Sequence, residues 1–243
     1  MKETTLHFAG LRIGVRYRYL LPERSPEFFA PPGAPYDFEV ALTDEDLARE
    51  KEFSRREAEL EGRSFSGALS SLEFSALHRR VARTLPRYNG IVFHASAVAV
   101  GDEAFVFTAK SGVGKTTHTR LWLKNVPGSF VVDGDKPVIR ATEKGIFVCG
   151  TPWNGKEKLG TNRSVKLRAI CHLCRGEENR IEKISLREAT PFLIEQTYRS
   201  PDPAELAQTL RLIKAVGEGV SLYRLTCNMK KEAALLSFGE MTK

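Results

Sequence analysis

The chain has 243 residues, a formal net charge of +7, 42% hydrophobic residues and 28% charged residues. These values are typical of a globular protein with one large domain or two small ones. No apolar run approaches the ~20 residues of a membrane span. Charged residues also interrupt the N-terminal segment, where a signal peptide would need a continuous apolar stretch. We therefore expect a cytoplasmic protein without a membrane partner.

The positive charge is unevenly distributed along the sequence. Residues 1–90 contain 14 Lys/Arg and 14 Asp/Glu, so the whole excess of +7 lies beyond residue 90. A basic field suits phosphate ligands or an acidic partner, although a basic surface without a role would look the same. The basic residues form no run and are not interleaved with aromatic residues, which argues against nucleic-acid binding.

The four cysteines include one C-x-x-C pair, Cys171 and Cys174. A structural zinc site usually needs two such pairs, and the sequence has no second one. Cys171 also lies in the apolar run 167–174, which reads as a strand. The pattern favours buried strand thiols over a metal site.

The first 90 residues predict a small α+β region. Alternation of apolar and polar residues over 11–18 predicts a half-buried strand, and 38–42 is a second strand candidate. Thr43 is a candidate N-cap for a charged helix extending to about Glu61. Helical spacing of apolar residues predicts another helix over 65–85, which Pro86 ends.

Beyond residue 90 the pattern changes to apolar strands followed by a loop and a helix. We expect a hairpin of strands 91–100 and 104–108 around a Gly101-Asp102 turn. The remaining predicted elements are a helix over 116–124, a strand over 130–132, a hairpin of 138–140 with 145–149, a strand over 167–174, and helices over 186–197 and 203–216. Ser200 and Asp202 are candidate caps for the last helix.

A phosphate-binding loop (P-loop) is predicted between the second of these strands and the helix. Residues Ala109 to Thr116 match G-x-x-x-x-G-K-[ST], except that Ala109 replaces the first glycine. Glycines allow a tight turn whose N–H groups point at phosphate oxygens, and the following helix adds its positive dipole end. Lys115 would reach the β- and γ-phosphates, and Thr116 would place its hydroxyl on magnesium. The predicted nucleotide contacts are Ala109, Ser111, Gly112, Val113, Gly114, Lys115, Thr116 and Thr117.

Two carboxylates follow the next apolar strand, in Asp133-Gly134-Asp135. The end of such a strand is where a P-loop protein holds magnesium or orders a nucleophile. The separation between Lys115 and Asp133 allows only one helix and one strand. Asp-Gly-Asp is also a good turn sequence, so a purely structural role for either aspartate is the alternative.

His94 lies on the strand that should pair with the strand feeding the P-loop. If Gly101-Asp102 is a two-residue turn, Val100 pairs with Glu103 and His94 faces Ala109. The histidine would then be near the phosphates, as a candidate catalytic residue. A hydrogen-bonded structural histidine is the competing interpretation.

These features together resemble the HPr kinase/phosphorylase family and, more distantly, the ATP-dependent phosphoenolpyruvate carboxykinases. The resemblance is carried by the P-loop from Ser111 to Thr116, by the histidine of His94-Ala95-Ser96, and by the aspartates after the next strand. It implies that Lys115 binds phosphate, that Thr116 and Asp135 hold magnesium, and that an aspartate takes the proton from a substrate serine. A similarity to small HPr-kinase-like proteins of peptide-modification systems implies a peptide serine as acceptor.

One departure from the family concerns the catalytic base. The family has adjacent aspartates, whereas this chain has Gly134 between Asp133 and Asp135. The base is then either Asp133, displaced by one residue, or absent. The resemblance covers roughly residues 90 to 160.

The loop from Gly150 onward is a candidate substrate site, because turn residues there surround an aromatic residue and several charges. Its basic residues would meet phosphate or an acidic partner, and Glu157 would be a further magnesium carboxylate. An ordinary surface loop with Trp153 packed inward is the alternative. The candidate substrate residues are Lys156, Glu157, Lys158 and Arg163.

The sequence therefore predicts an α/β fold with a mixed sheet, of the HPr kinase and phosphoenolpyruvate carboxykinase type. We expect an N-terminal α+β region over 1–89 and a nucleotide-binding domain over 90–243. The function expected is an ATP- and Mg²⁺-dependent serine kinase acting on a protein or peptide, with Asp133, Asp135, His94 and Lys115 as catalytic candidates. A nucleotide-binding regulator without turnover and a small-molecule kinase or carboxykinase are the alternatives. The oligomeric state is open, with a homo-oligomer as one alternative.

Overall fold

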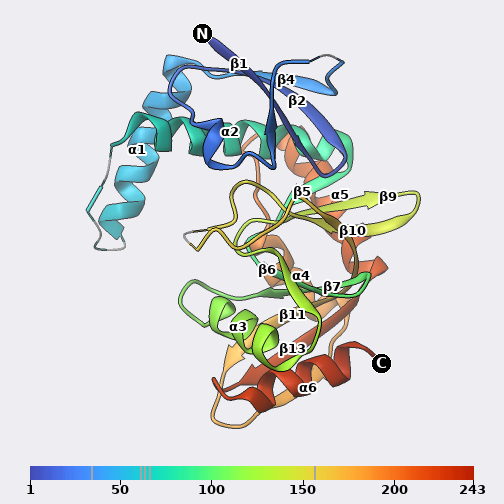
Figure 1. Cartoon of the computed structure of the whole chain (residues 1–243). Helices are drawn as coiled ribbons and strands as arrows, with labels where there is room; N and C mark the ends of the chain where they lie inside the picture. The colour runs from blue at the N-terminus through green and yellow to red at the C-terminus, as the bar shows by residue number, and fades with distance from the viewer. Residues whose placement is uncertain (34, 61, 63, 66, 156) are drawn as a thin grey trace. The chain divides into compact units, whose positions relative to one another are not determined.

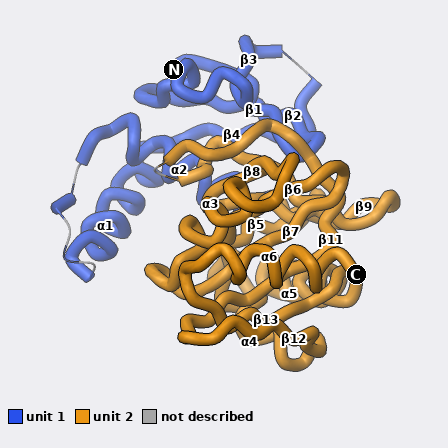
Figure 2. The backbone as a smooth tube through the Cα atoms, turned by 60° about the horizontal axis from the view of Figure 1, so that its bottom comes forward, with its two compact units in different colours: residues 1–84 blue, residues 85–243 orange. Residues whose placement is uncertain are grey.

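The computed structural model describes residues 1–243 except 34, 61, 63, 66 and 156. The described chain divides into two compact units, residues 1–84 and 85–243, coloured separately in Figure 2. Helices and strands occur in both (Figure 1), so the α/β character expected from the sequence is present. Among the described residues, no helix has the length and apolarity needed to span a membrane.

The described part of the N-terminal unit forms a four-stranded sheet, in the order β3-β1-β2-β4, with two helices. Ala9 and Gly10 both have positive φ, which suits the tight turn joining β1 to β2. The buried carboxylate of Glu73 accepts hydrogen bonds from the backbone N–H groups of residues 18–20, tying α2 to the chain after β2. The elements are β1 (Lys2–Phe8), β2 (Leu11–Tyr17), η1 (Pro22–Arg24), β3 (Phe29–Ala30), β4 (Phe38–Ala41), α1 (Asp44–Leu60) and α2 (Leu69–Thr84).

The C-terminal unit is built on a mixed sheet, which has nine strands in its described residues. The main path is β5-β9-β10-β11-β7-β6-β8; β13 lies beside β11, and β12 beside β13. β11 is parallel to β7 and β13, and the other pairs are antiparallel. The elements are η2 (Leu85–Tyr88), β5 (Gly90–Val92), β6 (Ser96–Val100), β7 (Glu103–Thr108), α3 (Lys115–Asn125), β8 (Ser129–Asp133), β9 (Val138–Thr142), β10 (Gly145–Cys149), β11 (Ser164–Arg175), β12 (Arg180–Lys183), α4 (Leu186–Gln196), α5 (Pro203–Gly219), β13 (Ser221–Cys227) and α6 (Lys231–Met241).

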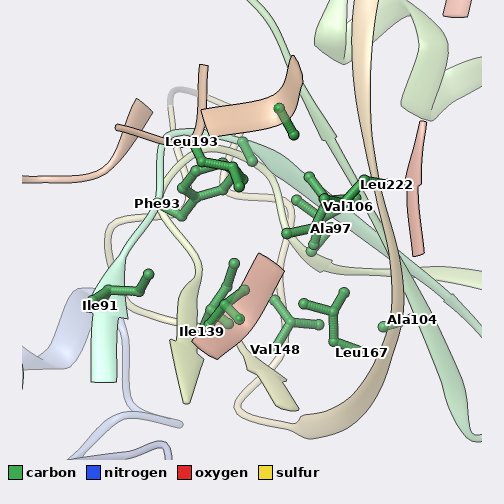
Figure 3. Close-up of a cluster of buried hydrophobic side chains, with 14 of the residues drawn as sticks. Ile91, Phe93, Ala97, Ala104, Val106, Ile139, Val148, Leu167, Leu193 and Leu222 are labelled. Carbon is green, nitrogen blue, oxygen red and sulfur yellow. The ribbon is translucent and has the colours of Figure 1, made fainter. Parts of the chain in front are cut away.

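Each face of this sheet is covered by a pair of helices, because successive residues of a strand point to opposite faces. On β7, Ala104 and Val106 belong to a core shared with α4 and α5, part of which Figure 3 shows. Phe105 and Phe107 belong to the core on the other face, with Trp122 of α3 and residues of α6. Burial on both faces explains why β7 reads as a continuous apolar run.

The prediction of one strand over 91–100 was wrong, because two strands are formed, β5 and β6. β5 pairs with β9, whereas β6 pairs with β7 and β8, so the chain crosses between distant positions in the sheet. In the crossing segment, Phe93 N donates to Pro137 O and Ala95 N to Asp135 O, both at 3.0 Å. The sheet curls so that residues 93–95 and 135–137 run beside each other. Periodicity missed the break because both strands are buried.

The other predicted elements of this unit formed. In the hairpin of β6 and β7, Val100 lies opposite Glu103, as a two-residue turn requires. Only α3 and β8 lie between the glycine-rich loop and the aspartates. Asp202 caps α5 by accepting from the N–H groups of Ala204 and Glu205.

Candidate functional site

The loop between β7 and α3, residues Ala109–Gly114, is called here the glycine loop. Gly112 has φ 78° and Gly114 φ 126°, a region that side chains other than glycine rarely adopt. Ala109, where the motif usually has glycine, is fully buried in the core beside α3. The backbone geometry therefore needs glycine at 112 and 114, and alanine is accommodated at 109.

Arg175, at the end of β11, holds the glycine loop from the neighbouring strand. Its guanidinium donates to the carbonyl oxygens of Gly112 and Val113. Arg175 thus fastens the glycine loop to the end of β11. The sequence did not predict this contact. No local motif marks Arg175, because the contact depends on the parallel pairing of β11 with β7.

Lys115 is the first residue of α3, and its side chain folds back along the glycine loop. Its Nζ donates to Ala109 O at 3.1 Å. Burial lowers the pKa of the Lys115 ammonium, while the negative charge of Asp135 acts in the opposite direction. A half-buried cation bonded to a neutral carbonyl oxygen is well placed to move onto an anionic ligand of the loop.

A cavity of about 310 Å³ opens beside the start of α3, and we call it the Asp135 cavity. Its volume lies within the ~300–1,000 Å³ range of small-molecule sites. Its walls come from β6, α3, the turn after β8 and the loop after β10. The lining residues are Ser96, Thr116, Thr119, Gly134, Asp135, Asn154, Gly155, Glu157 and Leu159. Three oxygen-bearing candidates from the sequence, Thr116, Asp135 and Glu157, thus share one cavity.

Asp135 is partnered by His94 from the crossing segment. His94 Nε2 lies 3.5 Å from Asp135 Oδ1, and its Nδ1 lies 3.1 Å from Gln196 Oε1 at the end of α4. Burial acts to raise the pKa of Asp135, but the hydrogen bond to His94 and the charges of Lys136, His94 and Lys115 keep it below its usual value. The Asp135 carboxylate therefore stays ionised at neutral pH.

The predicted position of His94 beside the start of the glycine loop agrees with the contacts of its backbone. Thr108 Oγ1, at the end of β7, donates to His94 O at 2.9 Å. The backbone N–H of His94 donates to Gln196 O at 2.7 Å. His94 is thus fixed by main-chain bonds on one side and by Gln196 on the other, and its ring is directed to Asp135.

Asp133 has a different environment from Asp135. It is 0% exposed, and it is not among the residues that line the Asp135 cavity. Its Oδ1 accepts from the N–H groups of Asp135 and Lys136, and its Oδ2 from the N–H and hydroxyl of Thr151. Burial raises the pKa of Asp133 to about 7, against the lowering effect of these four bonds. Through these bonds, Asp133 shapes the turn that carries Asp135.

Gly134 faces the backbone of the following loop at close range. A Cβ at position 134 would lie 2.8 Å from Asn154 O and 3.0 Å from Leu159 O. Neither oxygen can rotate away, since both belong to the main chain. The space that a second adjacent aspartate would need is therefore filled by this loop.

The loop after β10 meets α3 through one ion pair. Arg120 of α3 contacts Glu157 at 2.5 Å, which holds the carboxylate at the cavity. Trp153 is buried, as one of the two interpretations of this loop expected. Lys158 and Arg163 are not among the described residues that line the cavity; Arg163 lies over the Phe130 ring at 5.2 Å. Lys156 lies outside the described residues.

Another cavity, of about 320 Å³, opens beside the glycine loop on a different face of α3 from the Asp135 cavity, and we call it the His118 cavity. One wall is a face of α3 with His118 and Leu121; the other is formed by the ends of β11 and β13. Burial lowers the pKa of His118 to about 4, so its ring is neutral. Sequence patterns do not mark this cavity, because its walls come from segments about 50 residues apart in the chain.

The cysteines are free thiols, and Cys171 is buried in β11 as expected. Burial raises the pKa of Cys171 well above its usual value. Cys174 and Cys227 are partly exposed and line the His118 cavity. Among the described residues, no group of three or more His, Cys, Asp or Glu side chains could hold a metal ion.

His172 is a second histidine near the glycine loop that the sequence interpretation missed. It lies opposite Thr108 in the pairing of β11 with β7, and its ring stacks on Phe192 of α4 with centroids 4.7 Å apart. Burial lowers the pKa of His172, and the charges of Arg224 and Lys110 add to this effect against the charge of Glu195. A neutral stacked ring points to a packing role.

Comparison with known proteins gives little guidance. No family model matches the sequence, and no curated protein matches it. Among solved structures, the chain is similar to the HPr(Ser) kinase/phosphatase from Coxiella burnetii at 10% sequence identity and a TM-score of 0.32. That match covers 60% of this chain and 91% of the other. A likeness of this size says nothing about the reaction.

Proposed function

We propose that the protein is an ATP- and Mg²⁺-dependent kinase that transfers the γ-phosphoryl group to a hydroxyl acceptor, a serine of a protein or peptide. The observation that carries the proposal is the grouping of Thr116, Asp135 and Glu157 on one cavity next to Lys115. The serine acceptor rests on the sequence resemblance alone.

The residues at the Asp135 cavity fit a magnesium ion. They supply a hydroxyl and carboxylates, the hard oxygen ligands that Mg²⁺ prefers. Magnesium is usually held by one or two carboxylates together with waters and substrate phosphates, so a complete protein cage is not required. Thr116 and Asp135 would hold the ion, with Glu157 directly or through water. When bound, Mg²⁺ supplies charge neutralisation for the phosphates.

The glycine loop and Lys115 supply the remaining charge stabilisation. Backbone N–H groups of the loop and the start of α3 would donate to the phosphates, and the helix dipole would favour their negative charge. The Lys115 ammonium would leave Ala109 O and bind the β- and γ-phosphates. Phosphoryl transfer depends mainly on such positioning and electrostatics, since its transition state is loose.

The Asp135–His94 pair is the proton acceptor that the geometry favours. As the acceptor oxygen bonds to the γ-phosphorus, the bond to the β-phosphate oxygen breaks and ADP leaves with the electron pair. The hydroxyl proton passes to the imidazole of His94, which Asp135 orients while its carboxylate holds the ion. Asp133 is less suited to this role, because four donors already occupy its carboxylate oxygens.

A nucleotide-binding regulator without turnover is the second candidate, favoured by one observation. The crowding at Gly134 leaves no room for the adjacent aspartate of the family that the sequence resembles. Transfer and binding therefore have to be measured separately.

The test of the proposal compares two lysines of the same loop region. Titration of a fluorescent ATP analogue with Mg²⁺ should show Lys115→Ala weaker by about 10- to 100-fold, the scale of a lost charge-assisted hydrogen bond. Lys110→Ala removes an exposed lysine nearby and should change affinity by less than about 3-fold. Equal affinities in both folded variants would refute the phosphate-binding role of the loop.

Transfer is then tested with γ-labelled ATP and serine-containing peptides, with water as the alternative acceptor. Label on a serine that Asp135→Asn abolishes supports the kinase. Tight Mg²⁺-dependent binding without any transfer would support the regulator instead.

A further inference from the structure

The exposed side of α3 carries positive charge that the proposed phosphoryl transfer does not use. The segment 104–132, which contains the glycine loop and α3, has four Lys/Arg and no Asp/Glu. Two of these basic residues, Arg120 and Lys124, lie on α3 and are exposed. They follow Thr116, which lines the Asp135 cavity, at intervals of four residues. Residues four apart are neighbours on one helix face, so Thr116, Arg120 and Lys124 form a stripe that begins at the cavity, and we call it the α3 stripe.

Arg120 lies at the edge of the Asp135 cavity. Among the described residues, its one ionic partner is Glu157, at 2.5 Å, and the Arg120 side chain is 65% exposed. An ion pair that is open to water contributes little to stability, so it is easily broken. Glu157 also lines the cavity, where we propose that Mg²⁺ binds. Glu157 can therefore turn to the ion at little cost, which leaves the Arg120 guanidinium unpaired beside the cavity.

Lys124 continues the positive charge away from the cavity. It lies about two helical turns beyond Thr116 and forms no ion pair with a described residue. With Arg120 released, the α3 stripe presents two cations and no carboxylate of its own helix. A surface of this kind is complementary to a negatively charged partner.

We propose that the α3 stripe binds acidic residues of the acceptor peptide, beside the serine that receives the phosphoryl group. This rests on the proposed function, because the acceptor has to reach the Asp135 cavity. Asp135 and Glu157 would repel an acidic peptide, and Lys115 would be occupied by the phosphates of ATP. The α3 stripe supplies the opposite charge at the edge of the cavity, and the fork of a guanidinium matches a carboxylate in two hydrogen bonds.

Three serine peptides that differ only beside the serine test the preference. They carry Asp, Asn or Lys at the same positions, and transfer from γ-labelled ATP is measured with Mg²⁺. We expect KM to be about 3- to 10-fold lower for the Asp peptide than for the Asn peptide, the scale of two exposed ion pairs, with little change in kcat. The Lys peptide should have the highest KM. High salt should reduce these differences, because exposed charges are screened.

The outcomes separate this inference from the proposed function. Equal KM values for the three peptides at low salt would overturn the inference and leave the kinase intact. Transfer to none of the peptides would refute the serine kinase, and the inference would fail with it.

Two charge reversals locate the docking surface. Lys124→Glu should remove the preference for the Asp peptide, because it places a carboxylate on the α3 stripe. ATP affinity and kcat for the Asn peptide should not change, since Lys124 lines neither the Asp135 cavity nor the His118 cavity. Lys144→Glu makes the same change in charge at the exposed turn between β9 and β10, and it should keep the wild-type preference. A preference that persists in Lys124→Glu, or that Lys144→Glu also removes, would refute the α3 stripe.

Docking can be measured apart from transfer. A labelled Asp peptide with alanine in place of serine should bind the protein with Mg²⁺–ADP at least about 3-fold more tightly than the matching Lys peptide, measured by fluorescence anisotropy. Lys124→Glu should remove this difference. A DNA duplex of equal charge is the competitor, because a basic surface also attracts phosphates. If the duplex displaces the labelled peptide at a lower concentration than the unlabelled peptide does, the partner is nucleic acid and the inference is overturned.

Discussion

Substitution of Gly134 by alanine tests how tightly the loop after β10 is packed onto the aspartate turn. Gly134 does not have the left-handed backbone that excludes other residues, so the cost of a side chain is one of space. The added Cβ would meet Asn154 O at 2.8 Å and Leu159 O at 3.0 Å. To reach the 3.4 Å of an ordinary contact, the loop must retreat by about 0.6 Å.

The free energy of unfolding should fall as a result. Overpacking of a close-packed site costs ~1–3 kcal/mol, and two rigid oxygens place this case in the upper half of that range. Gly→Ala also restricts the unfolded chain, which offsets ~0.4–1 kcal/mol. We expect a net loss of about 1–2 kcal/mol. Binding of Mg²⁺–ATP should also weaken, because the displaced loop carries Glu157 and Leu159 of the Asp135 cavity.

Urea unfolding followed by tryptophan fluorescence measures this loss. Both tryptophans of the chain, Trp122 and Trp153, belong to the unit of residues 85–243, so the signal reports on the affected unit. Gly239→Ala is the matched control, because no neighbouring atom lies within 4 Å of its added Cβ and its site is helical. It should be neutral or stabilising by up to ~1 kcal/mol. Stability of Gly134→Ala within ~0.5 kcal/mol of wild type, with unchanged affinity, would refute the packing argument.

Further substitutions separate the roles of the site residues. Asp135→Asn should weaken the Mg²⁺ dependence of ATP binding and abolish transfer, measured by nucleotide titration with and without EDTA and by label transfer. Asp133→Asn should change how the stability of the protein depends on pH. In wild type, the pKa of Asp133 is about 7 in the folded protein, above the usual 3.8. Its contribution to stability is therefore present below about pH 4 and lost as the pH rises through 7. Urea unfolding at pH 5 and pH 8 should show this loss in wild type and not in Asp133→Asn. His94→Ala should slow transfer by ~10² or more with little change in ATP affinity. His94→Asn should be nearly as slow, since an amide side chain cannot take up the proton. An active His94→Asn would indicate a structural histidine. Arg175→Ala should weaken ATP binding by about 10-fold or less, because it loosens the glycine loop without touching phosphate.

The local part of the site was predictable from the sequence. A strand, a glycine-rich turn and a helix occupy adjacent residues, and their backbone geometry depends little on the rest of the chain. The two-residue turn fixed the register of β6 with β7, and hence the distance from His94 to the glycine loop. The short span between Lys115 and Asp135 limited the elements between them to α3 and β8.

Contacts between distant segments were not predictable by the same means. Arg175 shows no motif, because its contact with the glycine loop depends on the parallel pairing of β11 with β7. Parallel pairing leaves no turn signal, since its strands are joined through long crossovers. The distinction between Asp133 and Asp135 also needed the structure. Only the fold shows that Thr151 hydrogen-bonds to the Asp133 carboxylate, whereas Asp135 lines the Asp135 cavity.

The break between β5 and β6, which periodicity missed, explains how His94 reaches Asp135. In one continuous strand, the residues beside His94 would hydrogen-bond only to neighbouring strands of the sheet. In the crossing segment, Phe93 and Ala95 instead bond to Pro137 and Asp135, so the histidine between them lies next to the aspartate turn. Gln196 then fixes the ring from α4. The catalytic pair that we propose thus forms where the curl of the sheet brings residues 93–95 beside residues 135–137. A change that straightened residues 93–95 would separate His94 from Asp135 without altering either residue.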